Sequence, residues 1–578
     1  MKKSLLTLAC ALLCSGAAVA QGSGVMYEGL NFTNVSPNGR WLTENQQGVM
    51  AYIFDSQTKE NWTFFDENHL SAWFIGYGHS VTDEGMVCGS TQVYNEEAGW
   101  GYYSDAAYFK GGEWHALPQL SGRETGMNSA NAVTPDEYRI CGAQGVDNSS
   151  YDKDNLMMYP VIWTKNANGE YECQALPYPT RDFTNRCPQY VTAMDISADG
   201  KTVIGQVVDY SGFYTYPIVY NEKADGTWTY RLVNTSLVWD QSKLDALPAV
   251  PDQPTYPNVD DYMSEQDMAD YNAAYEYYNE CYYQCVAGDM DWNDLPPYPS
   301  KNEYISDEAK KAEYEAAMDQ YQIDNNEWYE AFSNFQDALQ EATTGASFVF
   351  NQTSLSPNGL YYLTCMSAPD PNADPDDFWA PSLSLPKVLD LSKEDGVSTI
   401  AATDKLTANI LNNGRYLVTS PASSYARNAY VANVGSEEVT PLVDWLNEMG
   451  QNTAAEFLKT NCVFDITDYA WNDETGSYEE VVLADSLITG TPIFSGDGKH
   501  IVSWYENPKT NAIDTYVLSL DISDEAAAIE GVKADEEATV IGREYYNLQG
   551  QRIAAPVEGV YLEKVITSKG THTNKCVK

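Results

Sequence analysis

Two acidic segments carry the residues best suited to bind a metal ion. Alternating oxygen ligands are what a hard cation such as Ca²⁺ requires, and both segments provide them. Neither has the glycine bend and the closing glutamate of an EF-hand loop, so calcium binding competes with the simpler interpretation of a solvated acidic loop. The first segment contains Asp370, Asn372, Asp374 and Asp376, and the second spans residues 289–294. No motif requires another cofactor.

Four tryptophans predicted to lie in loops are candidate ligand contacts, because an exposed indole ring stacks well on a sugar ring. They are Trp62, Trp73, Trp100 and Trp379. Aromatic residues make up 13% of the chain, and most of them are expected to fill the gaps between packed sheets.

No catalytic motif is recognisable in the sequence. It lacks a Gly-x-Ser-x-Gly elbow, a His-Glu-x-x-His pair and a phosphate-binding glycine loop, so the common hydrolase and nucleotide-binding classes have no support. The five histidines are not spaced as zinc ligands. With 83 acidic residues, two carboxylates will meet by chance in any fold, and such a pair is not a sign of glycosidase chemistry. The catalytic residues are therefore unknown.

The secondary-structure elements that must position these residues are encoded by a repeated sequence motif. Apolar residues, a Ser or Thr, and a polar pair ending in Gly precede an alternating apolar strand. Asn-Gly and Asp-Gly accept the positive φ of a tight hairpin turn. The turn glycines are Gly39, Gly85, Gly200, Gly359, Gly414 and Gly498, and Glu137 occupies the same position in the third copy. Further strand-like segments after each turn predict about four strands per repeat unit.

This repeat predicts an all-β fold, an approximately seven-bladed β-propeller over residues 26–520, because the shorter spacings match one blade and the longer ones imply insertions. The Ser-Pro-Asn-Gly and Ser-Ala-Asp-Gly turns resemble those of the Tol-associated, WD-like propellers. Residues 193–205, followed by 217–220, resemble the extracellular HAF-type repeat. The resemblance implies the fold and no particular activity.

Two insertions interrupt the repeats. Residues 255–345 show two apolar stripes at helical spacing, separated by Pro296-Pro297, and predict a helical hairpin whose stripes pack on each other as an autonomous accessory. Residues 251–345 contain 22 acidic residues and three lysines, so its outer face is strongly negative. A smaller insertion at 440–478 opens with a helix.

Both ends of the chain suggest export. Residues 1–20 have the basic start, apolar run and small-residue end of a signal peptide. An Ala- and Glu-rich linker at 521–538 leads to residues 539–578, where Leu548-Gln549-Gly550-Gln551 and a Gly-x-Tyr strand resemble the C-terminal sorting modules of exported Bacteroidetes proteins. The resemblance implies type IX-like secretion to the outer-membrane surface or medium. Periplasmic residence and another role for the tail are the alternatives.

Charge and hydropathy narrow the possible partners. The net charge of −50 disfavours nucleic acid and anionic membranes, and no later stretch approaches the ~20 apolar residues of a membrane helix. We therefore expect a non-enzymatic binding or scaffold protein that engages a glycan or a protein through the propeller face and the acidic insertion. A glycan- or peptide-active hydrolase with carboxylates in the propeller funnel and a structural envelope component are the alternatives. The oligomeric state is unknown.

Replacing Gly200 or Gly498 with valine tests the hairpin assignment. We expect a loss of about 1–3 kcal/mol in the free energy of unfolding, because a β-branched residue is strained at positive φ. A thermal melt that stays within about a degree of the parent protein would contradict the assignment.

Overall fold

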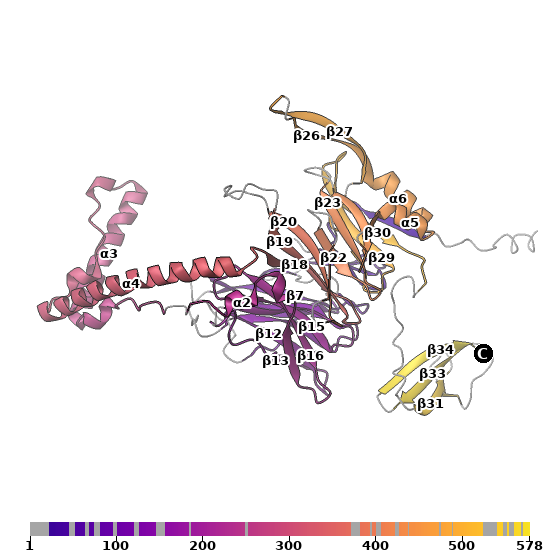
Figure 1. Ribbon diagram of the computed structural model, residues 1–578, viewed down its shortest axis with the longest axis horizontal. Helices are drawn as coiled ribbons and strands as arrows, with labels where there is room; N and C mark the ends of the chain where they lie inside the picture. Colours follow the sequence, from indigo (N-terminus) through magenta and orange to yellow (C-terminus); the bar gives the residue numbers. More distant parts are fainter. Residues whose placement is uncertain are drawn as a thin grey trace, which may run out of the picture.

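The computed structural model describes most of the chain, and mainly as β-sheet (Figure 1). The described residues are 22–44, 52–63, 69–73, 81–95, 101–120, 126–145, 156–183, 186–248, 252–370, 382–393, 396–399, 406–421, 427–436, 438–472, 475–487, 489–523, 540–546, 552–553, 560–567 and 570–577. Helices are few and lie in the insertions. In this part of the chain no helix is long and apolar enough to cross a membrane.

The repeats form a series of antiparallel units of four strands, which we number sheets 1 to 7. Sheets 1 to 3 are β2 (Asn34–Val35), β3 (Trp41–Glu44), β4 (Tyr52–Asp55) and β5 (Asn61–Thr63); β6 (His69–Trp73), β7 (Val87–Asn95), β8 (Gly101–Lys110) and β9 (Glu113–Ala116); and β10 (Asn128–Val133), β11 (Arg139–Gly145), β12 (Met158–Lys165) and β13 (Tyr171–Ala175). Sheet 4 is β14 (Tyr190–Ile196), β15 (Thr202–Val208), β16 (Thr215–Glu222) and β17 (Trp228–Leu232). One parallel pair, Met158 with Tyr190, joins sheets 3 and 4.

Sheets 5 to 7 follow the first insertion. Sheet 5 is β18 (Ser347–Leu355), β19 (Tyr361–Pro369), β20 (Ser382–Asp390) and β21 (Gly396–Thr399), and sheet 6 is β22 (Leu406–Ile410), β23 (Arg415–Pro421), β24 (Arg427–Asn433) and β25 (Val439–Pro441). Sheet 7 is β28 (Ile493–Phe494), β29 (His500–Asn507), β30 (Ala512–Ser519) and, from the start of the chain, β1 (Ser23–Tyr27). β1 pairs antiparallel with β30, Ser23 lying opposite Ser519.

The turn between the first and second strands has the predicted conformation in all seven sheets. The six turn glycines have φ between 71° and 78°. In the Ser-Ala-Asp-Gly copy, Ser197 Oγ donates to Asp199 Oδ1 at 2.7 Å and accepts from Thr202 N at 3.0 Å, which explains the recurring hydroxyl residue. Glu137 also has a positive φ, 58°, so the third turn keeps the same form without glycine.

Glu137 fills a buried position between sheets 2 and 3. Its carboxylate accepts a hydrogen bond from Thr82 Oγ1 at 3.0 Å and pairs with Lys110, and Lys165 Nζ lies 3.8 Å away. The side chain is 7% exposed. These contacts offset the cost of a non-glycine residue in the left-handed region, which is about 1–2 kcal/mol.

Hydrogen bonds join each sheet to the next, and the last sheet to the first. In order from sheet 1 they are Asn38 N to Asp83 Oδ1 (2.7 Å), Thr82 Oγ1 to Glu137 Oε1 (3.0 Å), Arg139 Nη1 to Gly200 O (2.8 Å), Ala198 N to Pro357 O (2.7 Å), Asn358 N to Asn412 Oδ1 (2.6 Å), Phe494 N to Asn409 Oδ1 (2.8 Å) and His500 Nδ1 with Pro37 O (3.1 Å). This cyclic series confirms a β-propeller fold.

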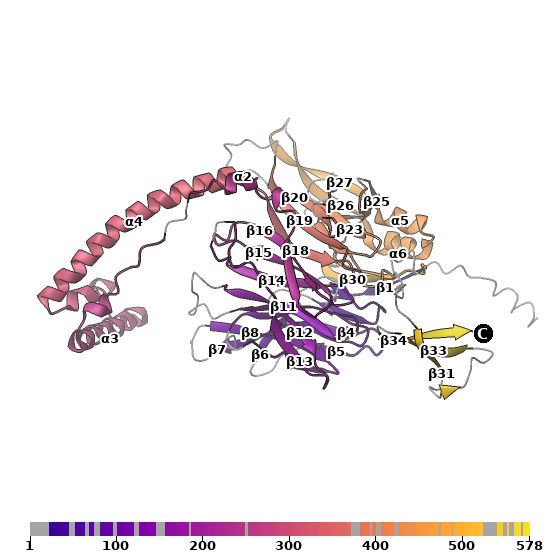
Figure 2. The ribbon, with the colours of Figure 1, turned by 60° about the horizontal axis from the view of Figure 1, so that its bottom comes forward.

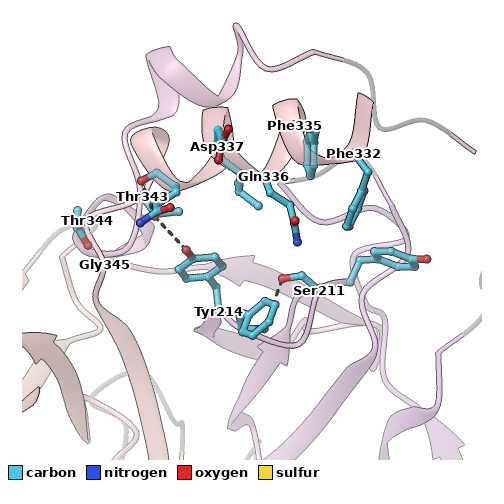
Figure 3. A pocket seen from close by; sticks show the side chains of 13 residues that line it. Ser211, Tyr214, Phe332, Phe335, Gln336, Asp337, Thr343, Thr344 and Gly345 are labelled. Carbon is cyan, nitrogen blue, oxygen red and sulfur yellow. Dashed lines mark hydrogen bonds between the residues drawn. The ribbon is translucent and has the colours of Figure 1, made fainter. Parts of the chain in front are cut away.

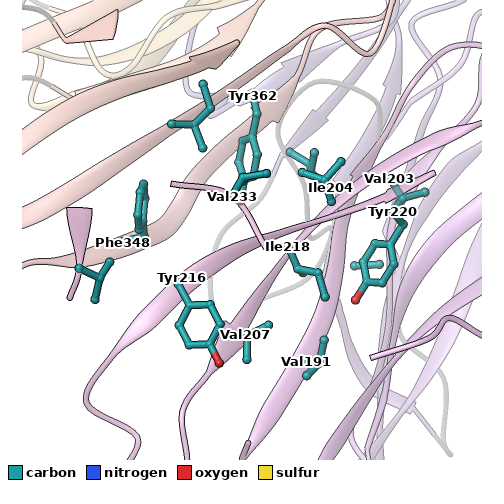
Figure 4. Close-up of a cluster of buried hydrophobic side chains, with 14 of the residues drawn as sticks. Val191, Val203, Ile204, Val207, Tyr216, Ile218, Tyr220, Val233, Phe348 and Tyr362 are labelled. Atoms are coloured by element: carbon teal, nitrogen blue, oxygen red, sulfur yellow. The ribbon is translucent and has the colours of Figure 1, made fainter. Parts of the chain in front are cut away.

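The core lies between successive sheets. Consecutive strand residues are buried, so both faces of a sheet carry core side chains, and the cluster around sheet 4 includes Val203, Ile204 and Ile218 (Figure 4). Tyr362 of sheet 5 packs into this cluster, and its hydroxyl donates to Gly205 O at 3.1 Å.

The first insertion, which we call the arm, runs from β17 to β18 and extends away from the sheets (Figures 1 and 2). Its elements are η2 (Thr235–Leu237), α2 (Gln241–Leu244), η3 (Val259–Tyr262), α3 (Glu265–Ala287), η4 (Trp292–Asp294), η5 (Lys301–Tyr304) and α4 (Glu308–Ala342). The aromatic stripe of α3 packs on the linker to α4, as Tyr278 with Tyr298 and Tyr271 with Tyr304 show. The prediction that the two helical stripes pack on each other is therefore wrong for this stripe, because α3 packs on the segment that links it to α4.

The last turns of α4 belong to the propeller core, which differs from the prediction of an autonomous insertion. Phe335, Leu339 and Ala342 are at most 5% exposed and pack in the same cluster as Tyr216 and Trp239. An apolar stripe shows that a helix face is buried, but not against which surface it is buried.

The second insertion continues beyond the predicted end at residue 478. It contains α5 (Leu442–Glu448), α6 (Asn452–Cys462) and a two-stranded ribbon, β26 (Val463–Asn472) with β27 (Ser477–Leu487). The tail forms a separate four-stranded antiparallel sheet of β31 (Val540–Tyr546), β32 (Arg552–Ile553), β33 (Val560–Thr567) and β34 (Gly570–Val577). The predicted signal peptide, residues 1–20, lies outside the described residues.

Candidate functional site

A groove of about 630 Å³ lies where the base of the arm meets sheet 4. One wall is the C-terminal end of α4, and the other is the loop between β15 and β16 (Figure 3). The lining residues are Tyr210, Ser211, Phe213, Tyr214, Phe332, Phe335, Gln336, Asp337, Leu339, Gln340, Thr343, Thr344 and Gly345.

A buried carboxylate shapes the loop side of the groove. Asp209 is fully buried and accepts hydrogen bonds from Tyr214 N at 2.7 Å and Ser211 N at 2.9 Å. Asp182 accepts a bond from Tyr210 N at 2.6 Å. Burial raises the pKa of Asp209, although the hydrogen bonds that Asp209 accepts from Ser211 and Tyr214 partly oppose the rise. The loop is therefore held in one conformation before any ligand arrives.

The helix side provides polar groups above an apolar floor. Gln336, Asp337 and Gln340 are exposed, whereas Phe335 and Leu339 are buried beneath them. The two walls are joined where Thr343 Oγ1 donates to the Tyr214 hydroxyl at 3.2 Å (Figure 3).

The groove combines aromatic rings with uncharged hydrogen-bonding groups. Phe213 is 72% exposed, and the amides of Gln336 and Gln340 supply both donors and acceptors. Among its thirteen described lining residues, Asp337 carries the one carboxylate, and none is a histidine, cysteine or lysine. The described lining therefore provides rings and hydrogen-bonding groups that a ligand could contact.

The calcium site at the first acidic segment stays a prediction, because only Asp370 of its four candidate ligands is described. Among the described residues, no group of three or more His, Cys, Asp or Glu is arranged to hold a metal ion. Asp370 is half-buried at the end of β19, and Asn372, Asp374 and Asp376 lie outside the described residues. In the segment 289–294, Asp291 caps η4 by accepting from Asn293 N at 2.9 Å.

The tryptophan candidates are only partly described. Trp62 lies in strand β5 and not in a loop, and its ring is 5.8 Å from that of Trp41 and 5.7 Å from that of Phe109, a packing position between sheets 1 and 2. Trp73 ends β6, where the backbone alone is described, and Trp100 and Trp379 lie outside the described residues.

One candidate segment begins beside the groove. A Cβ atom built on Gly345, a lining residue, would lie 3.0 Å from Pro369 Cγ, and Asp370 follows directly. Phe332 and Phe335 belong to the second of the two apolar stripes predicted within residues 255–345, but the sequence did not predict the groove. No sequence pattern near these residues indicates that they lie beside the loop 210–214, which is more than a hundred positions earlier in the chain.

The predicted funnel carboxylates can also be examined. The first strands of neighbouring sheets contact one another, as β14 with β18 and β18 with β22, so they surround the centre of the ring. Among the residues of these strands, Asp195 alone carries a carboxylate. Its Oδ2 accepts from Leu355 N of sheet 5 at 2.7 Å, a structural role.

No family model and no curated protein matches the chain. Among solved structures it is similar to the β-propeller domain of the trilobed protease from Pyrococcus furiosus (6% identity, 86% of this chain and 96% of that chain, TM-score 0.33) and to an oligogalacturonate lyase from Vibrio parahaemolyticus (7%, 86% and 91%, 0.37). It also matches prolyl oligopeptidase B from Galerina marginata (9%, 84% of this chain, TM-score 0.33), about half of whose length it spans, 47%. Similarity at this level carries no argument about activity.

Replacing Asp209 with asparagine should change how stability depends on pH. The pKa of Asp209 is higher in the folded protein than its unfolded value of about 3.9. Folding therefore takes up a proton, and this residue's contribution to the free energy of unfolding falls as pH rises from about 4 to the folded pKa. Urea melts of the parent protein and the variant between pH 4 and pH 7 give the free energy of unfolding at each pH. This free energy should fall less with rising pH in the variant than in the parent protein. Parallel curves would contradict the role of Asp209.

Proposed function

We propose that the protein is a secreted or surface-exposed, non-enzymatic binding protein, a seven-bladed β-propeller whose groove at the base of the arm holds a neutral glycan segment. The observation that carries this proposal is the lining of that groove, aromatic rings beside glutamine amides and hydroxyls with no catalytic pair. Its volume falls within the range of about 300–1,000 Å³ that is usual for small-molecule sites.

A neutral ligand fits better than an anionic one. The chain has a net charge of −50, which repels polyanions over long range. Lysine and arginine, the side chains that bind carboxylate or phosphate groups, are missing from the thirteen lining residues drawn in Figure 3. Hydroxyl groups of a neutral sugar can bond to the amides of Gln336 and Gln340 while its ring faces an aromatic side chain.

The alternative functions have weaker support. A hydrolase acting through paired carboxylates in the funnel would need a second carboxylate near Asp195, and the described first strands contain none. A structural envelope role would leave the groove without a purpose. Calcium binding by Asp370, Asn372, Asp374 and Asp376 remains part of the proposal.

Export is proposed from the ends of the chain. The signal-peptide pattern of residues 1–20 supports translocation. The separate sheet β31–β34 is compatible with a C-terminal sorting module, which supports a type IX-like route to the outer-membrane surface or medium for a protein of Bacteroidetes type.

Binding to an array of neutral oligosaccharides tests the proposal. Replacing both Gln336 and Gln340 with alanine should weaken the best ligand about tenfold or more, because two hydrogen bonds of about 0.5–1.5 kcal/mol each are lost. Gln320→Ala is the matched control, an exposed glutamine on the same helix but outside the groove, and it should bind as the parent protein does.

The proposal fails if no neutral glycan binds, or if Gln320→Ala weakens binding as much as the groove variant. Binding of peptides alone would assign the same groove to a protein partner and would contradict the glycan proposal.

A further inference from the structure

The outward face of helix α3 combines exposed tyrosines and glutamates, and the ring of Tyr283 also lies 5.9 Å from that of Tyr282. Tyr277 is 60% exposed and Tyr283 is 69% exposed, and Glu276 and Glu280 are exposed as well. Positions three, four and seven apart lie side by side on a helix, so Glu276, Glu280 and Tyr283 form one row and Tyr277 flanks Glu280. We call these four residues the α3 face.

The arm that carries this face has very few cations of its own. Residues 251–345 contain 22 acidic residues and three lysines. Two of the lysines are already paired, Lys301 Nζ with Asp260 at 2.7 Å and Lys310 Nζ with Glu313 at 2.9 Å. Most of the negative charge on the arm is therefore available to a partner's cations.

The arm itself shows how such a face can hold a cation. Lys301 Nζ lies 2.7 Å from Asp260 Oδ1 and 5.5 Å from the centre of the Tyr271 ring. An ammonium group between a carboxylate and an aromatic ring gains both an ion pair and a cation–π contact. The α3 face presents the same two kinds of group outward, without a lysine of the arm between them among the described contacts.

Charge decides which occupant fits. Nucleic acid and anionic membranes would be repelled, and a second copy of this chain would bring another charge of −50. We infer that the α3 face binds a lysine- and arginine-rich segment of a protein partner. This inference is independent of the glycan groove, because α4, with 35 residues, is about 50 Å long and separates the two surfaces (Figures 1 and 2).

The test uses the full mature chain and a fluorescent twelve-residue peptide of alternating lysine and alanine, with affinity measured by fluorescence anisotropy. Two variants change the α3 face, Glu276→Gln with Glu280→Gln and Tyr277→Leu with Tyr283→Leu. Two controls make changes of the same kind at exposed positions of α4, the double change Glu327→Gln with Glu330→Gln and the single change Tyr329→Leu. Far-ultraviolet circular dichroism checks that helix content is unchanged in all four.

Each α3 variant should lower the affinity for the peptide at least fivefold. Each control should lower it less than twofold. Tyr277→Phe with Tyr283→Phe should retain binding, because the ring face is kept. Affinity of the parent protein should fall as salt rises. Equal weakening in variants and controls would show attraction by net charge alone and would overturn the inference, as would failure of the parent protein to bind the peptide at low salt.

Discussion

The pairing of β1 with β30 is the interaction on which the rest of the structure depends. It joins residues 23–27 to residues 515–519, the two ends of the repeat region, and completes sheet 7. Gly24 permits the close approach of β1 to α6, because a Cβ atom at this position would lie 2.3 Å from the ring of Phe457 on α6. Closing so long a loop costs conformational entropy. The contacts between successive sheets, which cover apolar faces that no sheet can bury alone, recover that cost.

Ring closure also decides where function can be placed. Because the strands of each sheet are antiparallel, the glycine turns gather at one end of the ring, where they bond to one another. The connections from second to third strand and from one sheet to the next leave from the other end. The loop 209–214, the arm and the second insertion are all connections of this second kind. The turns at one end therefore hold neighbouring sheets together, and the longer connections lie at the opposite end, where loops tolerate variation.

Local patterns predicted the elements, whereas long-range packing set the site. The seven turns could be predicted because positive φ selects glycine, and even Glu137 kept the turn since Thr82 and Lys110 stabilise its side chain. The groove could not be predicted, because an apolar stripe on α4 does not say that Phe335 packs in the same cluster as Tyr216. Trp62 was interpreted as a loop residue, but its strand places it against Trp41 and Phe109.

The most direct test of the closed ring is amide hydrogen exchange in a chain that begins at residue 22 and in one that begins at residue 28. If β1 closes the ring, its removal should lower protection in sheet 7 and also in sheet 1, whose turn bonds to His500 through Pro37 O at 3.1 Å, while sheets 3 and 4 stay protected. Loss of protection confined to β30, with sheet 1 unchanged, would contradict the account, because it would show that β1 only covers an edge and does not hold the ring closed.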